Sequence, residues 1–295
     1  MKPKRISLGT RNTLVGLSFI LPNFIGFAIF ILIPVLFSLG LSFVEWNGFN
    51  KASFVGFKNF VTLFNDKYFA QAMQRTILFT VVNVVVTALV AMGLAVLCNK
   101  KIRGVGLFRS AMFFPYIASI VAVGAVWGML FMRDFGPINN ILRAVGIANP
   151  PGWLTSTSSA LWGVIIVSVW KNMGYYMIIY LAALQGIPSE LRESSAVDGA
   201  TGFRHFWKIT FPLLAPAHFF VVLMLTINSF KAFDLIFVLT EGGPGQATTL
   251  IVNYIYKQGF ISEKLGVASA AATILFAVVA VITAIQFKAE KKMDY

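Results

Sequence analysis

The chain has 295 residues, of which 58% are hydrophobic and 12% are charged, and its formal net charge is +13. A soluble domain is about 45–50% apolar, so this composition indicates a protein embedded in a membrane. In such a protein an excess of Lys and Arg reports orientation, so the positive charge does not indicate a nucleic-acid partner.

The sequence lacks the motifs of the common cofactor and metal sites. The one cysteine, Cys98, excludes an intrachain disulfide framework and a cysteine-based zinc site, and His205 and His218 lack a metal-ligand spacing. No GxxxxGK[ST] loop is present, so the chain is not expected to bind ATP. We therefore predict no cofactor, no metal site and no catalytic residue, and any energy that the protein uses must come from elsewhere.

Six apolar runs are long enough to cross a bilayer, which a helix does with about 20 residues. After a basic N-terminus at 1–13, residues 14–44 contain no charged side chain and form the first predicted span. A cleaved signal peptide is the alternative, but this run exceeds the usual apolar core of about 7–15 residues. A short tail is predicted at 288–295, after a core at 72–287 that holds the other five spans, at residues 76–97, 106–131, 159–184, 213–239 and 266–287.

The segments between the spans have distinct patterns. Residues 132–158 and the start of 240–264 are rich in glycine and proline and are predicted to form loops. Residues 45–71 carry an aromatic side chain every three or four positions, which predicts an amphipathic helix lying flat at the membrane surface. These aromatic residues are Phe54, Phe57, Phe60, Phe64 and Tyr68.

The distribution of Lys and Arg predicts the orientation of the spans. One set of alternating segments holds fourteen of the 24 Lys and Arg residues, and the other set holds eight. Because the more basic side usually faces the cytoplasm, both termini are predicted to be cytoplasmic and residues 45–71 extracytoplasmic. The more basic set consists of the N-terminus, residues 98–109, residues 185–212 and the C-terminal tail.

A polar stretch at residues 186–216 separates the fourth and fifth spans. Its density of charge excludes it from hydrocarbon, so it is predicted to be a cytoplasmic loop. Ser189 after Pro188 predicts the start of a short helix, and Gly199 predicts its end. A second, amphipathic helix is predicted to follow and to end near Pro212, with one aromatic face made of Phe203, Phe206 and Trp207.

The string IPSELRESSAVDGA, followed by Phe206, Pro212 and Pro216, resembles the EAA loop of binding-protein-dependent ABC import permeases. In that family the loop at 186–212 is a cytoplasmic coupling helix that docks on the ATP-hydrolysing subunit. Ser194 and Ser195 depart from the family pattern, which has alanines there. The resemblance implies roles in ATPase coupling for Glu190, Glu193, Asp198, Gly199, Ala200 and Phe206.

The strings FVGFKNFVTLFNDKYF and TEGGPGQATT further resemble the sugar-permease group of this family. The resemblance implies an all-α, polytopic type I ABC importer permease with six transmembrane helices in a bacterial inner membrane, translocating a carbohydrate. It also implies a heterodimer with a second permease, a pair of ATPase subunits and an extracytoplasmic solute-binding protein. The alternatives are a non-sugar solute such as glycerol 3-phosphate, an ion-coupled secondary transporter, and a membrane-embedded enzyme.

Charged and amide side chains inside the spans are the candidates for the translocation path, because such residues usually face protein or a water-filled cavity. Lys171 and Asn172 lie near the middle of the fourth span. Lys231 and Asp234 are three residues apart in the fifth span, where a helix would let them form an ion pair. A purely structural pair, or a lysine reaching toward the outer interface, is the alternative to a role in the path. Asn83 and Asn228 are expected to serve helix packing.

Overall fold

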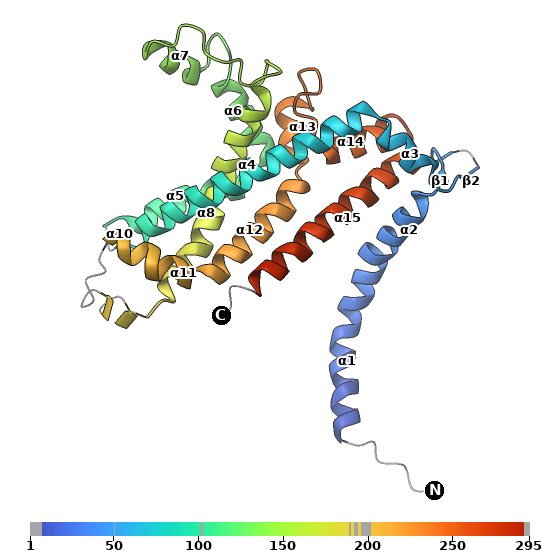
Figure 1. Cartoon of the computed structure of the whole chain (residues 1–295), viewed down its shortest axis with the longest axis horizontal. Helices are drawn as coiled ribbons and strands as arrows, with labels where there is room; N and C mark the ends of the chain where they lie inside the picture. The colour runs from blue at the N-terminus through green and yellow to red at the C-terminus, as the bar shows by residue number, and fades with distance from the viewer. Residues whose placement is uncertain are drawn as a thin grey trace. The chain divides into compact units, whose positions relative to one another are not determined.

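The computed structural model describes residues 8–49, 51–100, 103–188, 190–191, 194–195 and 202–291 of the chain. These residues are mostly helical and include one two-stranded hairpin (Figure 1). They belong to two compact units, one made of residues up to Asn65 with Lys257–Ile274, the other of Asp66–Tyr256 with the residues from Leu275 onward. Four of the described helices are long and apolar enough to cross a membrane, or up to six if each of two bent pairs counts as one span.

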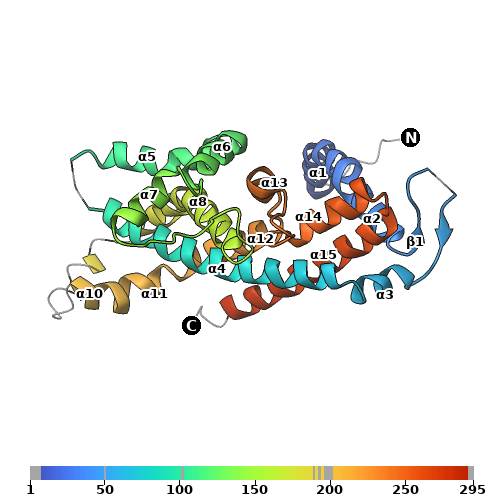
Figure 2. The same cartoon turned by 90° about the horizontal axis from the view of Figure 1, so that it is seen from above.

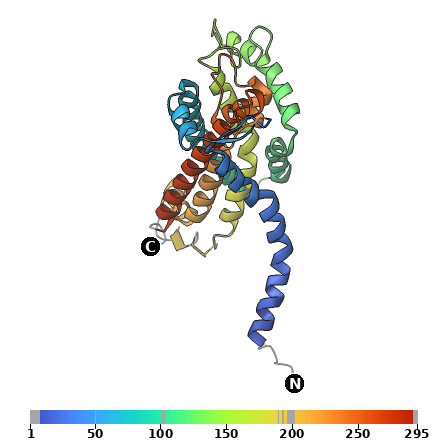
Figure 3. The same cartoon turned by 90° about the vertical axis from the view of Figure 1, so that its right-hand side faces the viewer.

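A long apolar helical run opens the first unit. The helix α1 (Leu8–Phe27), the π-helical segment η1 (Ala28–Leu32) and α2 (Ile33–Leu41) follow one another without a break (Figure 3). The most apolar window of this run has no buried residue within the chain. A helix that is apolar all round is stable in lipid or inside a larger assembly. The chain is thus helical over most of the first predicted span, and Val15–Leu41 is long and apolar enough to cross a membrane.

A hairpin replaces part of the flat helix predicted at 45–71. The strand β1 (Val44–Glu45) pairs antiparallel with β2 (Ser53–Phe54). The helix α3 (Lys58–Phe64) covers the third and fourth positions of the predicted aromatic repeat, and the fifth, Tyr68, lies in the next helix. The prediction was therefore wrong for Phe54 and Phe57. Buried Asn59 fixes the hairpin, because its Nδ2 donates to the carbonyls of Ser42 and Val44, each at 2.9 Å. The segment η3 (Lys257–Ile261) and the start of α15 (Leu265–Glu290) complete this unit.

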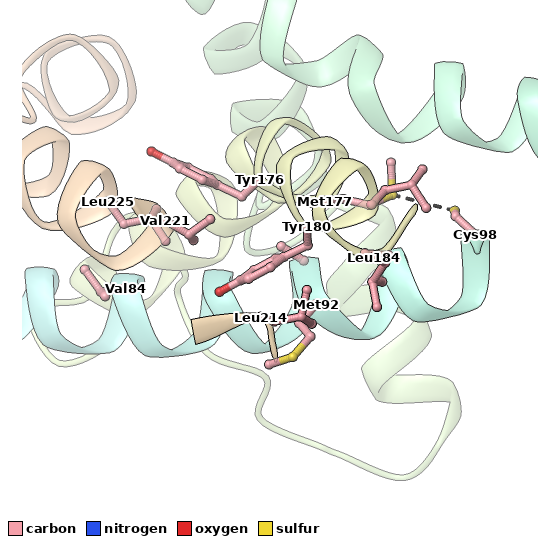
Figure 4. Packing of buried hydrophobic residues seen from close by; sticks show 13 residues of the cluster. Val84, Met92, Cys98, Tyr176, Met177, Tyr180, Leu184, Leu214, Val221 and Leu225 are labelled. Carbon is pink, nitrogen blue, oxygen red and sulfur yellow. Dashed lines mark hydrogen bonds between the residues drawn. The ribbon is translucent and has the colours of Figure 1, made fainter. Parts of the chain in front are cut away.

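The second unit is built around the helices α4 (Lys67–Cys98), α8 (Ala160–Gln185) and α12 (Ala215–Phe230). The helix α8 lies between α4 on one side and the pair α5 (Val105–Ile117) and α6 (Ile120–Leu130) on the other (Figure 2). Tyr176 and Tyr180 of α8 are buried in the cluster that α4, α8 and α12 share (Figure 4). Phe206 and Phe211, which follow the coupling segment, pack against this cluster.

The start of α4 differs from the predicted one. The helix begins at Lys67 rather than at residue 76, because the Asp66 side chain caps it by accepting a hydrogen bond from the Tyr68 amide at 2.8 Å. The same carboxylate accepts a hydrogen bond from the Tyr254 hydroxyl at 2.6 Å. The helix end is thus also tied to α14 (Ile251–Tyr256).

Two predicted spans are interrupted. The third span, predicted as one helix at 106–131, consists of α5 and α6, which meet at an angle of 101°. The fifth, predicted at 213–239, ends as α12 at Phe230 and resumes as α13 (Asp234–Thr240). One predicted loop also contains helix, since α7 (Pro137–Ala144) lies within 132–158, whereas α14 follows the loop predicted at the start of 240–264. Hydropathy alone did not reveal the first break, because no charged residue lies near Ala118 and Ser119, whereas Lys231 and Asp234 lie at the second.

Candidate functional site

The coupling loop is described in part. Glu193, Asp198, Gly199 and Ala200 lie outside the described residues, so the structure adds nothing to what the resemblance implies for them. Glu190 and Leu191 are described, and both are exposed to solvent. A carboxylate beside an exposed leucine offers a partner both a charge and an apolar contact.

Ser195 joins the two arms of this loop. Its side chain is 4% exposed, and its Oγ lies 2.7 Å from Nδ1 of His205. The sequence showed only that a serine replaces the alanine of the family at this position, and that the two side chains are similar in size. The hydroxyl in fact makes a contact that alanine cannot make, across a sequence separation of ten residues.

The second helix of the loop is confirmed, but its aromatic face is divided. The segments α10 (Gly202–His205), η2 (Phe206–Thr210) and α11 (Phe211–Leu213) precede a 68° bend into α12. Phe206 is half-buried and packs against the cluster shared by α4, α8 and α12. Phe203 is 80% exposed, whereas Trp207 is 47% exposed and its ring packs on that of Phe211, with 4.8 Å between the centroids.

A buried polar contact links the bend to α8. Nδ1 of His218, in the first turn of α12, lies 2.9 Å from the hydroxyl of fully buried Tyr180. The Phe211 ring packs on the His218 ring, with 4.5 Å between their centroids. Through Phe206, Phe211 and His218 the loop helix is therefore in continuous contact with α8.

Lys171 is held by backbone carbonyls. Its Nζ donates to the carbonyl oxygens of Pro115, Tyr116 and Ala118 at 3.2, 3.1 and 3.2 Å. Neighbouring Asn172 bonds within its own helix, since its Nδ2 donates to the Ser168 carbonyl at 2.8 Å. The two adjacent candidates for the path thus have different surroundings.

Lys231 and Asp234 are not an ion pair. The helix α12 ends before Lys231 and α13 starts at Asp234, so the helical spacing assumed for the pair does not exist. Both residues are exposed, and no salt bridge joins them. The predicted pairing was therefore wrong, and each charge is separately available at the gap between the two helices.

The asparagines of the spans connect helices, as predicted. Asn83 Nδ2 of α4 donates to the Ser229 hydroxyl of α12 at 2.9 Å, and Asn228 Nδ2 donates to the Tyr176 hydroxyl of α8 at 3.3 Å. Hydrogen bonds of this kind hold helices together in a bilayer, where the hydrophobic effect does not.

The TEGGPGQATT segment is a loop, as predicted, and is held by its own threonines. The Thr240 and Thr248 hydroxyls lie 2.7 Å apart, and the Thr249 hydroxyl donates to the Gly242 carbonyl at 3.0 Å. Beside it is a cleft of about 810 Å³ between the ends of α6 and α13. Polar side chains line part of this cleft, namely Arg133, Asp134, Thr155, Thr240 and Glu241.

Long apolar helices, two bent pairs and a polar helical loop with an exposed carboxylate together define a multi-pass membrane permease. The chain belongs to the family of binding-protein-dependent transport system inner membrane components, whose model matches residues 105–295. It is a permease subunit of an ABC importer of the inner membrane and has that family's fold; it is not an enzyme.

Several relatives match over nearly the whole chain. It is 37% identical to the "Probable starch degradation products transport system permease protein AmyD" of Thermoanaerobacterium thermosulfurigenes, with 94% of each chain covered. It is 36% identical to the lactose transport system permease protein LacF of Rhizobium radiobacter, with 98% of each covered. It is 34% identical to the sn-glycerol-3-phosphate transport system permease protein UgpA of Brucella abortus, covering 96% of this chain and 97% of that one.

A solved structure with a similar fold is a bacterial ABC transporter that imports the acidic polysaccharide alginate. The match has a TM-score of 0.84 and 25% identity, and it covers 97% of this chain and 98% of that one. A second structure shows the alginate transporter in complex with an alginate pentasaccharide-bound periplasmic protein, with a TM-score of 0.83, 25% identity and 96% of each chain covered.

Proposed function

We propose that this chain is the membrane-spanning subunit through which an ABC importer takes up a carbohydrate. The observation that carries the proposal is the similarity over nearly the full length to permeases named for starch products and for lactose, at 37% and 36% identity. The alginate transporter, with its TM-score of 0.84, supports a saccharide as the solute. A solute such as glycerol 3-phosphate is the second candidate, favoured by the 34% identity to UgpA.

The partners follow from the same proposal. The chain pairs with a second permease, receives solute from an extracytoplasmic binding protein, and is driven by a dimer of ATP-binding subunits. Both termini and the coupling loop lie in the cytoplasm, a placement supported by the fourteen Lys and Arg residues of that set of segments. The lipid bilayer surrounds the spans.

Coupling to the ATPase passes through residues 190–200 and Phe206. Glu190 is exposed and able to contact a partner, and Glu193, Asp198, Gly199 and Ala200 complete the docking segment. Phe206 packs against the core cluster. The Ser195–His205 contact joins the docking segment to the helix that carries Phe206. A displacement of the docked segment is therefore passed through α10–α11 to α8 and α12.

The translocation path includes Lys171, Asn172, Lys231 and Asp234. Lys231 and Asp234 are exposed and lie at the gap between α12 and α13. These two exposed charges face a water-filled cavity, where they are able to bind the hydroxyl groups of a solute. Lys171 and Asn172 contribute at the break between α5 and α6.

The test is reconstitution of the complex in lipid nanodiscs. We expect ATP hydrolysis that is stimulated by the binding protein loaded with its sugar, and no uptake into proteoliposomes without the ATPase subunits. The second candidate solute is tested by repeating the measurement with a binding protein loaded with glycerol 3-phosphate. The substitution Gly199→Leu should abolish stimulated transport, while the chain still inserts into the membrane and assembles with its partners. Uptake by the purified chain alone would contradict the proposal.

A further inference from the structure

The break between α5 and α6 leaves backbone carbonyls without helical partners. The last carbonyls of any helix lack an intrahelical donor. Here α5 stops at Ile117, and the next residues, Ala118 and Ser119, have extended ψ angles of 145° and 132° before α6 begins. Lipid offers such carbonyls no hydrogen-bond donor, so a break within a membrane span is stabilised by a donor from the protein.

Lys171 of α8 is that donor. Its ammonium has three N–H groups, and the structure places one carbonyl within hydrogen-bond distance for each: those of Pro115, Tyr116 and Ala118. A cation is also favoured at the carboxyl end of a helix, where the dipole is negative. The Lys171 ammonium thus finds hydrogen-bond acceptors, and the unpaired carbonyls find a donor. Either group without the other would be energetically costly in a bilayer.

The two halves of the broken span share α8 as a neighbour, since the Trp127 ring of α6 packs on the Trp170 ring of α8 at 5.4 Å, but each also has a close contact of its own. The helix α5 is pressed against α8, because a Cβ at Gly174 would meet the Met112 carbonyl, and the Tyr116 and Tyr175 rings stack at 4.4 Å. The helix α6 is pressed against α13, because a Cβ at Gly124 would meet the Val238 side chain. Lys171 therefore lies at the joint between two helices that both pack on α8, and of these α6 also packs on α13.

We propose that Lys171 is a positioning residue that fixes the angle of the α5–α6 joint and does not itself bind the solute. The inference deepens the proposed function, since the joint belongs to the proposed path. Broken helices of other transporters hold a coupling cation at such half-helix carboxyl ends. Here the ammonium of Lys171 occupies that place, so the joint needs no free cation, as suits a transporter driven by a separate ATPase.

The test measures the joint directly in the assembled complex. Spin labels are placed at Leu107 of α5 and Met129 of α6, both exposed, in a Cys98→Ala background, and their distance is measured in nanodiscs. We expect one narrow distance distribution with Lys171 and a broad or shifted distribution in K171M. K171R should broaden the distribution less than K171M does, because a planar guanidinium still donates to the three converging carbonyls but fits them less well than an ammonium. K231M is the matched control, since Lys231 makes no hydrogen bond to this joint. Its distribution should stay narrow.

An unchanged narrow distance in K171M would overturn the inference. If the K171M complex does not assemble, the spin-label distance in K171R is the test, because K171R keeps the positive charge but changes the geometry of the donor. An unaltered distance in K171R would also overturn the inference. If instead the proposed function is wrong, the complex that retains Lys171 would show no stimulated ATP hydrolysis, whatever its spin-label distance. The two failures can therefore be distinguished. Because the Lys171 ammonium occupies the carbonyls of the joint, no sodium ion is needed there, and solute uptake should not depend on sodium. Sodium-dependent uptake would count against the inference.

Discussion

Ser195 Oγ and His205 Nδ1 lie 2.7 Å apart and connect the two arms of the coupling loop. The serine is buried, and the histidine is the last residue of α10, directly before Phe206. Because Phe206 packs against the core cluster, this single hydrogen bond links the docking segment to the helices of the membrane domain.

The first prediction concerns this contact. S195A and H205A should each weaken the stimulation of ATP hydrolysis by solute-loaded binding protein, since one hydrogen bond contributes about 1 kcal/mol. The double variant should be no worse than either single one, because residues that act through one contact are not additive. S194A is the matched control, since Ser194 is exposed and its hydroxyl donates to the Leu191 carbonyl of its own turn at 3.3 Å. Additive losses would mean that the two residues act separately.

The second prediction separates the aromatic residues of the loop. F206A should reduce transport at unchanged basal ATP hydrolysis, because it removes the ring that packs against the core cluster. F203A, which removes a ring that is 80% exposed, should have little effect on either measurement. Thermal unfolding of the purified complex gives a second comparison. Truncating a fully buried Phe costs about 3–5 kcal/mol, so F206A should lose less than this and F203A almost nothing. Equal effects of the two variants would refute the division of the aromatic face.

The third prediction concerns the approach of α5 to α8. G174A should destabilise the complex, because its Cβ would meet the Met112 carbonyl, which is backbone and cannot rotate away. G93A in α4 is the control, since a Cβ there meets nothing within 4 Å. Replacing a helical glycine with alanine at an open site is neutral or favourable by up to about 1 kcal/mol. The melting temperature in detergent should therefore fall for G174A only, and a fall of similar size in G93A would contradict the packing argument.

The fourth prediction tests Lys231 and Asp234 as separate charges. K231M and D234N should each lower solute uptake while leaving membrane insertion intact, and their effects should add. Exchange of the two charges, K231D with D234K, should not restore uptake, because the residues do not form an ion pair. Uptake is measured in proteoliposomes at equal protein incorporation. Recovery in the exchanged variant would show that they pair during transport, and normal uptake in both single variants would remove them from the path.

The sequence alone determined several features of this protein. The positions of the long spans could be predicted because a bilayer requires about 20 consecutive apolar residues, a condition that each stretch meets or fails by itself. The loop helix after Gly202 could be predicted because amphipathic spacing and proline act within a few residues. The family was recognisable because the coupling segment is one continuous string.

Only the tertiary structure decided which polar groups meet. Lys171 and the carbonyl of Tyr116 are 55 residues apart, and their contact depends on how α8 is rotated against α5. The same holds for Asn83 with Ser229 across 146 residues. The breaks after Ile117 and Phe230 were hidden for a related reason, since hydropathy measures the cost of transfer to lipid and not the direction of the chain. Where a helix bends in a membrane depends on which neighbouring side chain can satisfy the freed backbone groups, and that neighbour is chosen by packing.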